Sequence, residues 1–361
     1  MRRTPALIIG GGPAGSAAAI MLGQGGVASE LIERRTAPHD VVCGGFLGWD
    51  SLAALERLDL DIFALGARPI TYLRLVNGRQ TLEVELPRRA AGFSRRSLDA
   101  ALLSLAVAGG TIAKRGVAVR EVDSATLSAR MDDGKEVVAD ALFLATGKYD
   151  LRGLARPASW TGMGAVGLRT LLNAPIAGKS LDGCIELHLF DGGYAGLLLQ
   201  EDGNANLCLS VAKERMSVAR APDTLVAMLK DEAPLLGERI GNGNERKWEA
   251  IAGVPYGWRA KETEYGVYRL GDQAAVISSL AGDGVAIAMQ SGITAATAFL
   301  RHGASGAAAY QTAFARQARA PVALAGLLRS AAERPLSRPL LMQLASIPGL
   351  ASIAARLTRI H

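Results

Sequence analysis

A short apolar segment, a cluster of glycines and a helical segment follow one another at the start of the chain, and this order most constrains the fold. Residues 6–9 (Ala-Leu-Ile-Ile) predict a strand that is buried on both faces of a parallel sheet. Residues 16–22 predict a helix, and residues 29–32 predict a second apolar strand that ends at Glu33. This succession is typical of the β-α-β unit that opens a Rossmann-like domain.

The glycines between the first strand and the helix predict a site for the pyrophosphate of a dinucleotide. Gly10 allows a tight turn, Gly12 lets the phosphates approach the backbone, and Gly15 lets the helix pack against the strand. The helix N-terminus offers free N–H groups to the anion. Glu33, 21 residues after Gly12, is placed to accept hydrogen bonds from an adenosine ribose. The residues assigned to this site are Gly10, Gly12, Pro13, Ala14, Gly15, Glu33 and Arg34.

A second match to the glycine pattern, at residues 162–167, is interpreted differently. Residues 154–160 before it do not form a buried-strand pattern, and residues 166–170 predict a strand rather than a helix. We therefore expect one dinucleotide and no separate nicotinamide domain.

Two later strands end in turns that suit FAD rather than NAD. Residues 141–145 form an apolar strand before Gly147, and residues 267–270 form another before Asp272. A helix is predicted after residues 282–284. An NAD-dependent dehydrogenase has no use for this late unit. In a FAD protein, the aspartate can hold the ribityl hydroxyls and the helix N-terminus can face the isoalloxazine ring.

Five blocks of sequence, in one order, carry a resemblance to a known family. They are residues 10–33, 41–45, 93–102, 145–148 and 271–284. Over roughly residues 5–300, the chain resembles the flavoproteins of the p-hydroxybenzoate-hydroxylase fold, and among them the geranylgeranyl-reductase-like branch. One departure is Ser279, where the family usually has a proline.

The resemblance implies roles for several residues. Arg95 would contact the FAD, Asp272 would hold the ribityl chain, and the turn of Cys43 and Gly44 would lie beside the flavin ring. The other FAD-binding candidates in these blocks are Thr146, Gly147, Gly282, Asp283, Gly284 and Val285.

The implied fold is α/β, with a Rossmann-like FAD-binding domain, an inserted α+β substrate domain built on an antiparallel sheet, and C-terminal helices. Residues 185–190, 194–199 and 205–211 predict an antiparallel meander, which a hairpin around Asn77-Gly78 is expected to join. Helices near residues 223–230 would cover the far face of this sheet. We assign residues 1–68, 92–158 and 265–302 to the FAD-binding domain, 69–91 and 159–264 to the substrate domain, and 303–361 to the C-terminal helical region.

The meander departs from the aromatic motif of the family in a way that bears on the substrate. Tyr194 is retained, whereas Gly196 stands where a Trp is usual and the final Pro is absent. Replacing an indole with a hydrogen would open space above the flavin. The halogenase alternative is disfavoured, since the Trp pair and the usual lysine context are missing.

Three residues are candidates for catalysis, and each has a structural alternative. Cys43 either donates a proton opposite a hydride or packs as a small residue under the flavin. Tyr194 either binds a carbonyl or donates a proton, or it is a core tyrosine. His188 shares a strand face with Glu186 and Phe190, which either lines the substrate cavity or is solvated. His39 and Asp40 are placed to order the Cys43 turn.

Charge is concentrated at the end of the chain. The net charge of the 361 residues is +6, and residues 321–361 hold five arginines and one glutamate. The rest is nearly neutral, which excludes a protein that coats nucleic acid. We predict helices broken at Pro321, Pro335, Pro339 and Pro348. They form either a cover with its arginines in water or an amphipathic surface for an acidic membrane or an acyl carrier protein.

Cysteine usage and hydropathy indicate the compartment. Cys43, Cys184 and Cys208 are too widely spaced for a disulfide framework, and we expect a reducing cytoplasm and no metal site. No apolar stretch in the sequence is long enough to span a bilayer, although contact of the C-terminal helices with a membrane surface is an alternative.

Together these features predict a FAD-dependent oxidoreductase. It would reduce or dehydrogenate a mostly apolar organic substrate, either carrier-tethered or similar to a lipid or polyketide, by hydride transfer at flavin N5 with NAD(P)H as reductant. One alternative is a single-component flavin monooxygenase that uses NAD(P)H and oxygen on an aromatic or polyketide substrate. Another is a flavin-bound partner protein without turnover.

Overall fold

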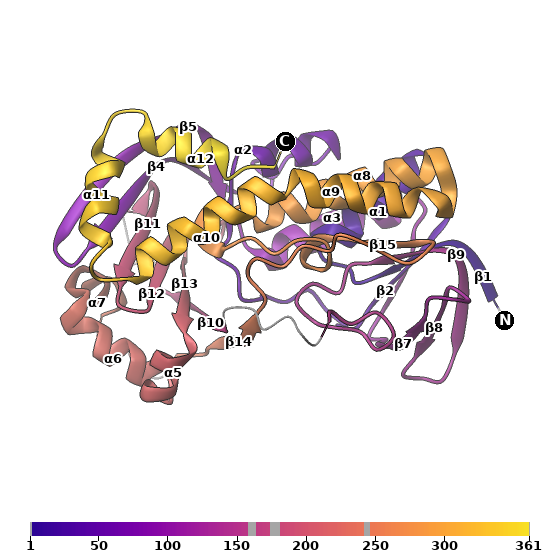
Figure 1. The fold of residues 1–361 in the computed structure, drawn as a ribbon, viewed down its shortest axis with the longest axis horizontal. Coiled ribbons are helices and arrows are strands. Elements are labelled where there is room, and N and C mark those ends of the chain that lie inside the picture. The colour runs from indigo at the N-terminus through magenta and orange to yellow at the C-terminus, as the bar shows by residue number, and fades with distance from the viewer. Residues whose placement is uncertain (1, 158–163, 174–180, 242–245, 361) are drawn as a thin grey trace.

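The computed structural model describes residues 2–157, 164–173, 181–241 and 246–360, which form two sheets connected by helices (Figure 1). The first sheet has the order β6-β2-β1-β9-β8-β7, with β15 also paired to β9. Its strands are β1 (Arg2–Ile9), β2 (Ser29–Glu33), β6 (Ile112–Arg115), β7 (Val119–Asp123), β8 (Ser128–Met131), β9 (Glu136–Leu144) and β15 (Val267–Arg269). The strands β1, β2, β6, β9 and β15 pair in parallel, as the opening β-α-β pattern predicts.

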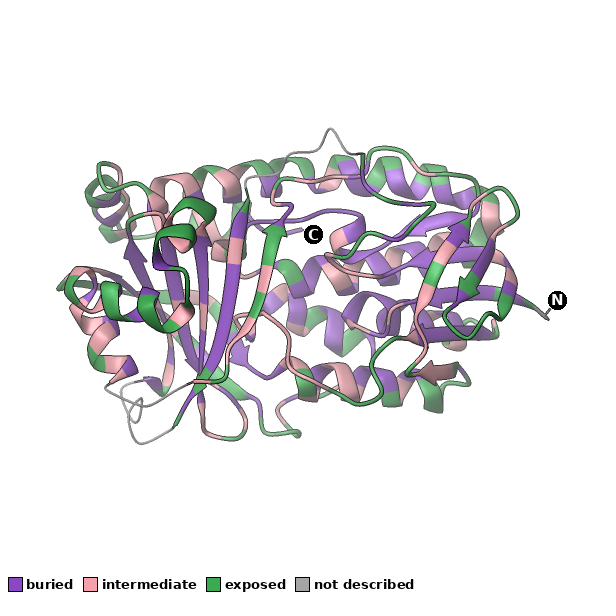
Figure 2. Cartoon of the chain, turned by 90° about the horizontal axis from the view of Figure 1, so that it is seen from below, coloured by how far each residue is buried: buried purple, intermediate pink, exposed green. Residues whose placement is uncertain are grey.

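Helices cover this parallel sheet, and two of them cross very closely. They include α1 (Pro13–Gln24), α3 (Arg95–Ala108), α8 (Gly284–His302) and α9 (Gly306–Gln317), with α2 (Trp49–Arg57) at one end of α8. A Cβ atom on Gly292 of α8 would lie 2.3 Å from the Ala14 carbonyl oxygen of α1, so only glycine fits at this crossing. Figure 2 shows the strands of both sheets largely buried.

The second sheet holds both inserted segments. Its order is β14-β10-β13-β12-β11-β4-β5-β3. The strands are β3 (Phe46–Leu47), β4 (Arg68–Asn77), β5 (Gln80–Gly92), β10 (Ala165–Leu172), β11 (Gly183–Phe190), β12 (Gly193–Leu199), β13 (Ala205–Ala212) and β14 (Glu249–Val254). The meander β11-β12-β13 is antiparallel, and the β4-β5 hairpin joins it, which confirms both expectations.

The prediction of an antiparallel sheet is wrong at one place. β11 and β4 pair in parallel, with Leu187 opposite Leu75. Parallel neighbours need no direct turn between them, and more than a hundred residues separate these two strands. β3 also pairs with β5, although residues 46–47 lie in the range assigned to the FAD-binding domain.

Three helices cover the far face of the second sheet, as expected. They are α5 (Lys213–Ala219), α6 (Pro222–Glu232) and α7 (Pro234–Ile240). Leu225 and Leu229 of α6 belong to one buried cluster with Leu207 and Leu209 of β13.

The C-terminal region forms α10 (Arg319–Glu333), α11 (Arg338–Ser346) and α12 (Leu350–Leu357), and α10 crosses from the first sheet to the second (Figure 1). The expected break at Pro321 is wrong. Pro321 lies in the first turn of α10, where its missing N–H has no helical partner to lose.

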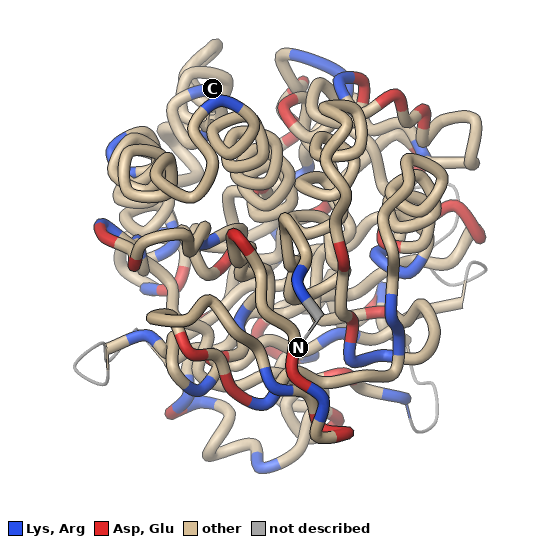
Figure 3. Tube along the Cα trace, turned by 90° about the vertical axis from the view of Figure 1, so that its right-hand side faces the viewer, with Lys and Arg blue, Asp and Glu red and all other residues tan. Residues whose placement is uncertain are grey.

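The expectation that the C-terminal arginines lie in water is also wrong for three of them. Arg329, Arg338 and Arg359 are buried. Arg329 donates to Glu333 at 2.6 Å, and Arg338 approaches Asp191. At the end of the molecule that carries the N-terminus, by contrast, residues of both charges are mixed (Figure 3).

Candidate flavin and substrate site

The glycine loop has the geometry that a bound pyrophosphate requires. Gly10 has a φ of +113°, and a Cβ on Gly15 would lie 1.9 Å from the Gly10 carbonyl oxygen. Gly12, by contrast, lines a cavity, and the nearest atom to a Cβ there is Nη2 of Arg95 at 3.6 Å. Gly10 and Gly15 therefore serve the tight turn and the close packing behind it, and Gly12 stands where the backbone is open to a ligand.

Glu33 braces this loop from the end of β2. Its Oε2 accepts from the Gly11 N–H at 2.8 Å, and its Oε1 accepts from the Arg35 N–H at 2.8 Å. The Arg34 guanidinium lies 3.9 Å from the centre of the Tyr149 ring. The contacts of Glu33 explain why an acid ends this strand, and its hydrogen bond to a ribose stays a prediction.

Arg95 places a positive charge against the glycine loop. It begins α3, after Ser94 caps the helix, and its Nε donates to Asp99 at 2.8 Å. Burial raises the pKa of Asp99, although the Arg95 charge opposes that shift. The position of Arg95 beside Gly12 suits contact with an anionic cofactor.

Two turns from distant parts of the chain form another wall of the cavity. Gly147 and Lys148 follow β9, and Asp272 follows β15. Burial opposes the charge of Lys148, but attraction to the Asp272 carboxylate raises the pKa of this lysine. Thr146, by contrast, is not among the residues that line the cavity, and its hydroxyl donates to the Tyr149 carbonyl at 2.7 Å.

Arg156 connects these two turns and was not identified from the sequence. Its guanidinium donates to the Gly147 carbonyl at 3.1 Å and to the Asp272 carbonyl at 2.8 Å. Gln273 adds a bond to the same Gly147 oxygen at 2.8 Å. Both residues act through side chains that donate hydrogen bonds to backbone carbonyls. Such contacts leave no local sequence motif by which the two residues could have been identified.

The N-terminus of α8 also faces the cavity. Gly282, Gly284 and Val285 line it, and a Cβ on Gly284 would meet nothing within 4 Å. Asp283 is placed differently from the expectation for a cofactor ligand. Its carboxylate is fully buried and accepts from Arg359 at 2.7 Å. Burial raises the pKa of Asp283 to about 6, although Arg359 lowers it.

The Cys43 turn is held from the second sheet. Cys43 and Gly44 line the cavity, and the Gly45 N–H donates to the Cys43 sulfur at 3.5 Å. Asn206 of β13 donates to the carbonyls of Cys43 and Gly44 at 3.0 and 2.7 Å. Arg169 supports Asn206 and pairs with Asp40, which bears out the ordering role expected of that aspartate.

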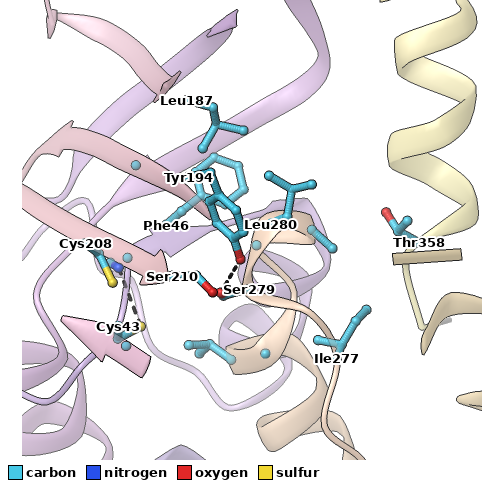
Figure 4. Close-up of a pocket in the computed structure, with 18 of the residues that line it drawn as sticks. Cys43, Phe46, Leu187, Tyr194, Cys208, Ser210, Ile277, Ser279, Leu280 and Thr358 are labelled. Atoms are coloured by element: carbon cyan, nitrogen blue, oxygen red, sulfur yellow. Dashed lines mark hydrogen bonds between the residues drawn. The ribbon is translucent and has the colours of Figure 1, made fainter. Parts of the chain in front are cut away.

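A chain of hydroxyls lies on the substrate side of the cavity (Figure 4). Ser279 is 2.5 Å from the Tyr194 hydroxyl and 2.7 Å from the Tyr256 hydroxyl. Burial raises the pKa of Tyr194, so its phenol keeps its proton at neutral pH. The departure from proline at position 279 thus has a structural consequence, because a proline has no hydroxyl to connect the two tyrosines.

His188 does not line this site, and both interpretations of its strand face are wrong. It is 1% exposed and does not line the cavity, and its Nε2 lies 3.1 Å from Glu186. Glu186 also pairs with Arg74 and Arg239, and its pKa falls to about 2 because these hydrogen bonds outweigh burial. His188 therefore belongs to a buried ionic cluster on the opposite face of β11.

The substrate side of the cavity is apolar. The cavity has a volume of about 600 Å³, and the face of β11 that turns toward it carries Ile185, Leu187 and Leu189. A Cβ on Gly196 would have only ordinary contacts, with Leu187 at 3.5 Å. Gly196 itself lines the cavity, so the position at which an indole is usual borders this space.

The residues present fit a bound FAD. Gly12 and Gly284 both border the cavity with room beyond their backbones, Arg95 supplies a cation, and Asp272 supplies a carboxylate. Two helix N-termini, those of α1 and α8, point at the same cavity.

Comparisons with known proteins agree with this site. The family model of the FAD binding domain matches residues 3–145. A menaquinone reductase of Mycolicibacterium smegmatis is 25% identical over 314 residues, which cover 81% of this chain and 76% of that protein.

Two solved structures share the fold. The flavin-dependent brominase Bmp2 has a TM-score of 0.79 and 18% identity over 99% of this chain and 93% of that chain. A geranylgeranyl bacteriochlorophyll reductase-like protein from Thermoplasma acidophilum has a TM-score of 0.76 and 17% identity over 100% and 94% of the two chains.

The fold is that of the flavoproteins of the p-hydroxybenzoate-hydroxylase type, as the resemblance implies. The match of residues 3–145 to the FAD binding domain, together with the fit of the residues that line the cavity, supports FAD as the cofactor.

Proposed function

We propose that this protein is a FAD-dependent reductase of an apolar, lipid-like substrate, with NAD(P)H as the reductant. The observation that carries the proposal is the cavity, which joins the candidate FAD site to a wall of leucines and isoleucines. The similarity to a menaquinone reductase supports reduction rather than oxygen insertion, and menaquinone is an apolar quinone.

When bound and reduced, FAD supplies a hydride. The chain's own residues then have two tasks. The hydroxyls of Tyr194, Ser279 and Tyr256 hold the polar end of the substrate, because they are the hydrogen-bonded hydroxyl groups on that side of the cavity. The Cys43 thiol donates the proton that completes reduction of a carbon–carbon double bond, since its turn is fixed by Asn206 at the cavity wall.

Burial of the substrate in this cavity also excludes water. Leu187 and Leu189 of β11 line the cavity together with Leu328 and Leu341 of the C-terminal helices. An apolar chain placed there exchanges water for hydrocarbon contacts, which contributes roughly 25 cal/mol for each Å² buried. The C-terminal helices are therefore part of the substrate site and not only a cover.

The test is turnover with and without oxygen. The purified, FAD-loaded protein is mixed with NADPH under anaerobic conditions, and menaquinone is then added in detergent. We expect the flavin to be reduced by NADPH and re-oxidised when menaquinone is added. Turnover that requires air and consumes oxygen only when substrate is present would instead establish the monooxygenase alternative. A protein that binds FAD but turns over no substrate would support the partner-protein alternative.

A further inference from the structure

Six large apolar side chains of α11, α12 and the segments next to these helices are exposed, and we call them the apolar face. Leu336 is 97% exposed, Leu340 is 56% exposed and Ile353 is 53% exposed. The other exposed apolar side chains of this face are Leu344, Ile347 and Leu357. Monomeric proteins rarely leave so many large apolar residues together in water without a partner.

This face borders the substrate cavity. Leu344 is exposed and also lines the cavity, and Leu341 and Ala345 line it from the same helix. Leu350 and Ala354 of α12 contribute to the same wall. A substrate that enters between the two helices would therefore pass through the apolar face.

The charge of the segment favours an acidic partner. The sequence has no Asp or Glu between Arg334 and His361, and Arg334 and Arg356 are exposed. Acidic side chains lie at the border with β5, where Glu83 and Glu85 line a separate groove beneath the α11–α12 connection. The apolar face is thus accompanied by the positive charges of Arg334, which follows α10, and Arg356 in α12.

Buried residues in α11 and directly after α12 anchor the two helices to the rest of the protein. Arg338 and Met342 of α11 are buried, and Arg359 after α12 is paired with Asp283. No single helix in the described part of the chain is long and apolar enough to cross a bilayer, whereas α11 and α12 pass that test only as a pair bent by 107°. An amphipathic helix that combines an apolar face with basic residues is typical of helices that lie in a membrane interface.

We propose that the apolar face of α11 and α12 docks on an anionic lipid bilayer and opens the substrate cavity to it. Docking on the bilayer does not itself depend on the proposed function. Only the identity of the substrate that enters the cavity rests on it. The exposed leucines and isoleucines would enter the headgroup region, and Arg334 and Arg356 would contact lipid phosphates.

The experiment is co-sedimentation of the FAD-loaded protein with vesicles of phosphatidylglycerol or of phosphatidylcholine at low salt. We expect binding to the first and weaker binding to the second. The double variant Leu340→Ser, Ile353→Ser should bind on the order of 100-fold more weakly, because each side chain contributes about tenfold. Val218→Ser on α5 is the matched control, since Val218 is 71% exposed on the opposite side of the second sheet.

Neither Leu340 nor Ile353 lines the cavity, so the double variant should keep its flavin spectrum and its turnover of substrate dispersed in detergent. This separates docking from the proposed function, because vesicle binding needs no turnover. Equal binding by the double variant and the wild type would overturn the proposal. Binding to an acyl carrier protein without binding to vesicles, or burial of this face between two copies of the chain in solution, would overturn it as well.

Discussion

Arg359 donates a hydrogen bond of 2.7 Å to the carboxylate of Asp283, the residue that precedes helix α8. The same guanidinium lies 4.5 Å from the centre of the Trp49 ring at the start of α2. Arg359 also lines the cavity, so one side chain ties the C-terminal helices to the helix that faces the candidate flavin site. The C-terminal region is thereby connected to the site through a buried ion pair.

Removal of this arginine should destabilise the protein strongly. Arg359→Ala leaves a buried carboxylate without its cation, and we expect a loss of about 3–5 kcal/mol in the free energy of unfolding. Urea unfolding of the FAD-loaded protein measures it. Arg301→Ala, at an exposed position of α8, is the control and should change stability by less than about 0.5 kcal/mol. Equal effects of the two substitutions would contradict the role given to Arg359.

The pH dependence of stability should contain a contribution from Asp283. Burial raises the pKa of Asp283 to about 6, so the folded protein binds this proton more tightly than the unfolded chain does. Its contribution is complete below about pH 4 and is lost as the pH rises toward 6, with an upper limit of about 3 kcal/mol. Plots of the free energy of unfolding against pH should therefore differ in slope between wild type and Asp283→Asn from about pH 4 to about pH 6. Parallel plots would exclude the shift in the pKa of Asp283.

The hydroxyl chain should matter more for turnover than for FAD binding. Tyr194→Phe removes the hydroxyl that Ser279 contacts, and we expect kcat/KM to fall on the order of 10²-fold. Ser279→Ala should cost about tenfold, since both tyrosines keep their hydroxyls but lose the group that connects them. Steady-state kinetics and FAD titration measure the two effects. Tyr265→Phe, at an exposed position, should leave both unchanged.

Filling the space beside Gly196 should narrow the range of substrates. Gly196→Trp would project an indole into the cavity, and we expect KM for a bulky apolar substrate to rise at least about tenfold. Gly196→Ala should have little effect, because its Cβ would have only ordinary contacts. Competition between a short and a long apolar substrate checks the prediction, and an unchanged preference in Gly196→Trp would place the substrate elsewhere.

Local patterns allowed much of the FAD-binding half to be predicted. Gly10, Gly12 and Gly15 act within six residues of one another, and their requirements are set by backbone geometry at that turn. The β4-β5 hairpin is likewise predicted by the residues of its own turn, Asn77 and Gly78.

Other parts of the site depend on contacts between distant segments. The alternation in β11 was visible in the sequence, but it did not show which face meets the cavity. The apolar face does, and His188 lies on the other face, where Arg74 and Arg239 neutralise Glu186. The partner of Asp283 lies 76 residues away in the sequence, which no local pattern indicates.

The most direct test of the proposed reductase is the origin of the atoms added to the substrate. FAD-loaded protein is reduced anaerobically with NADPH in deuterium oxide and is then mixed with menaquinone for a single turnover. We predict a product that carries deuterium on carbon and no added oxygen, because the hydrogens at flavin N5 and on the Cys43 thiol both exchange with the solvent. In a parallel reaction under ¹⁸O₂, a product that carries the heavy oxygen and no deuterium would contradict it.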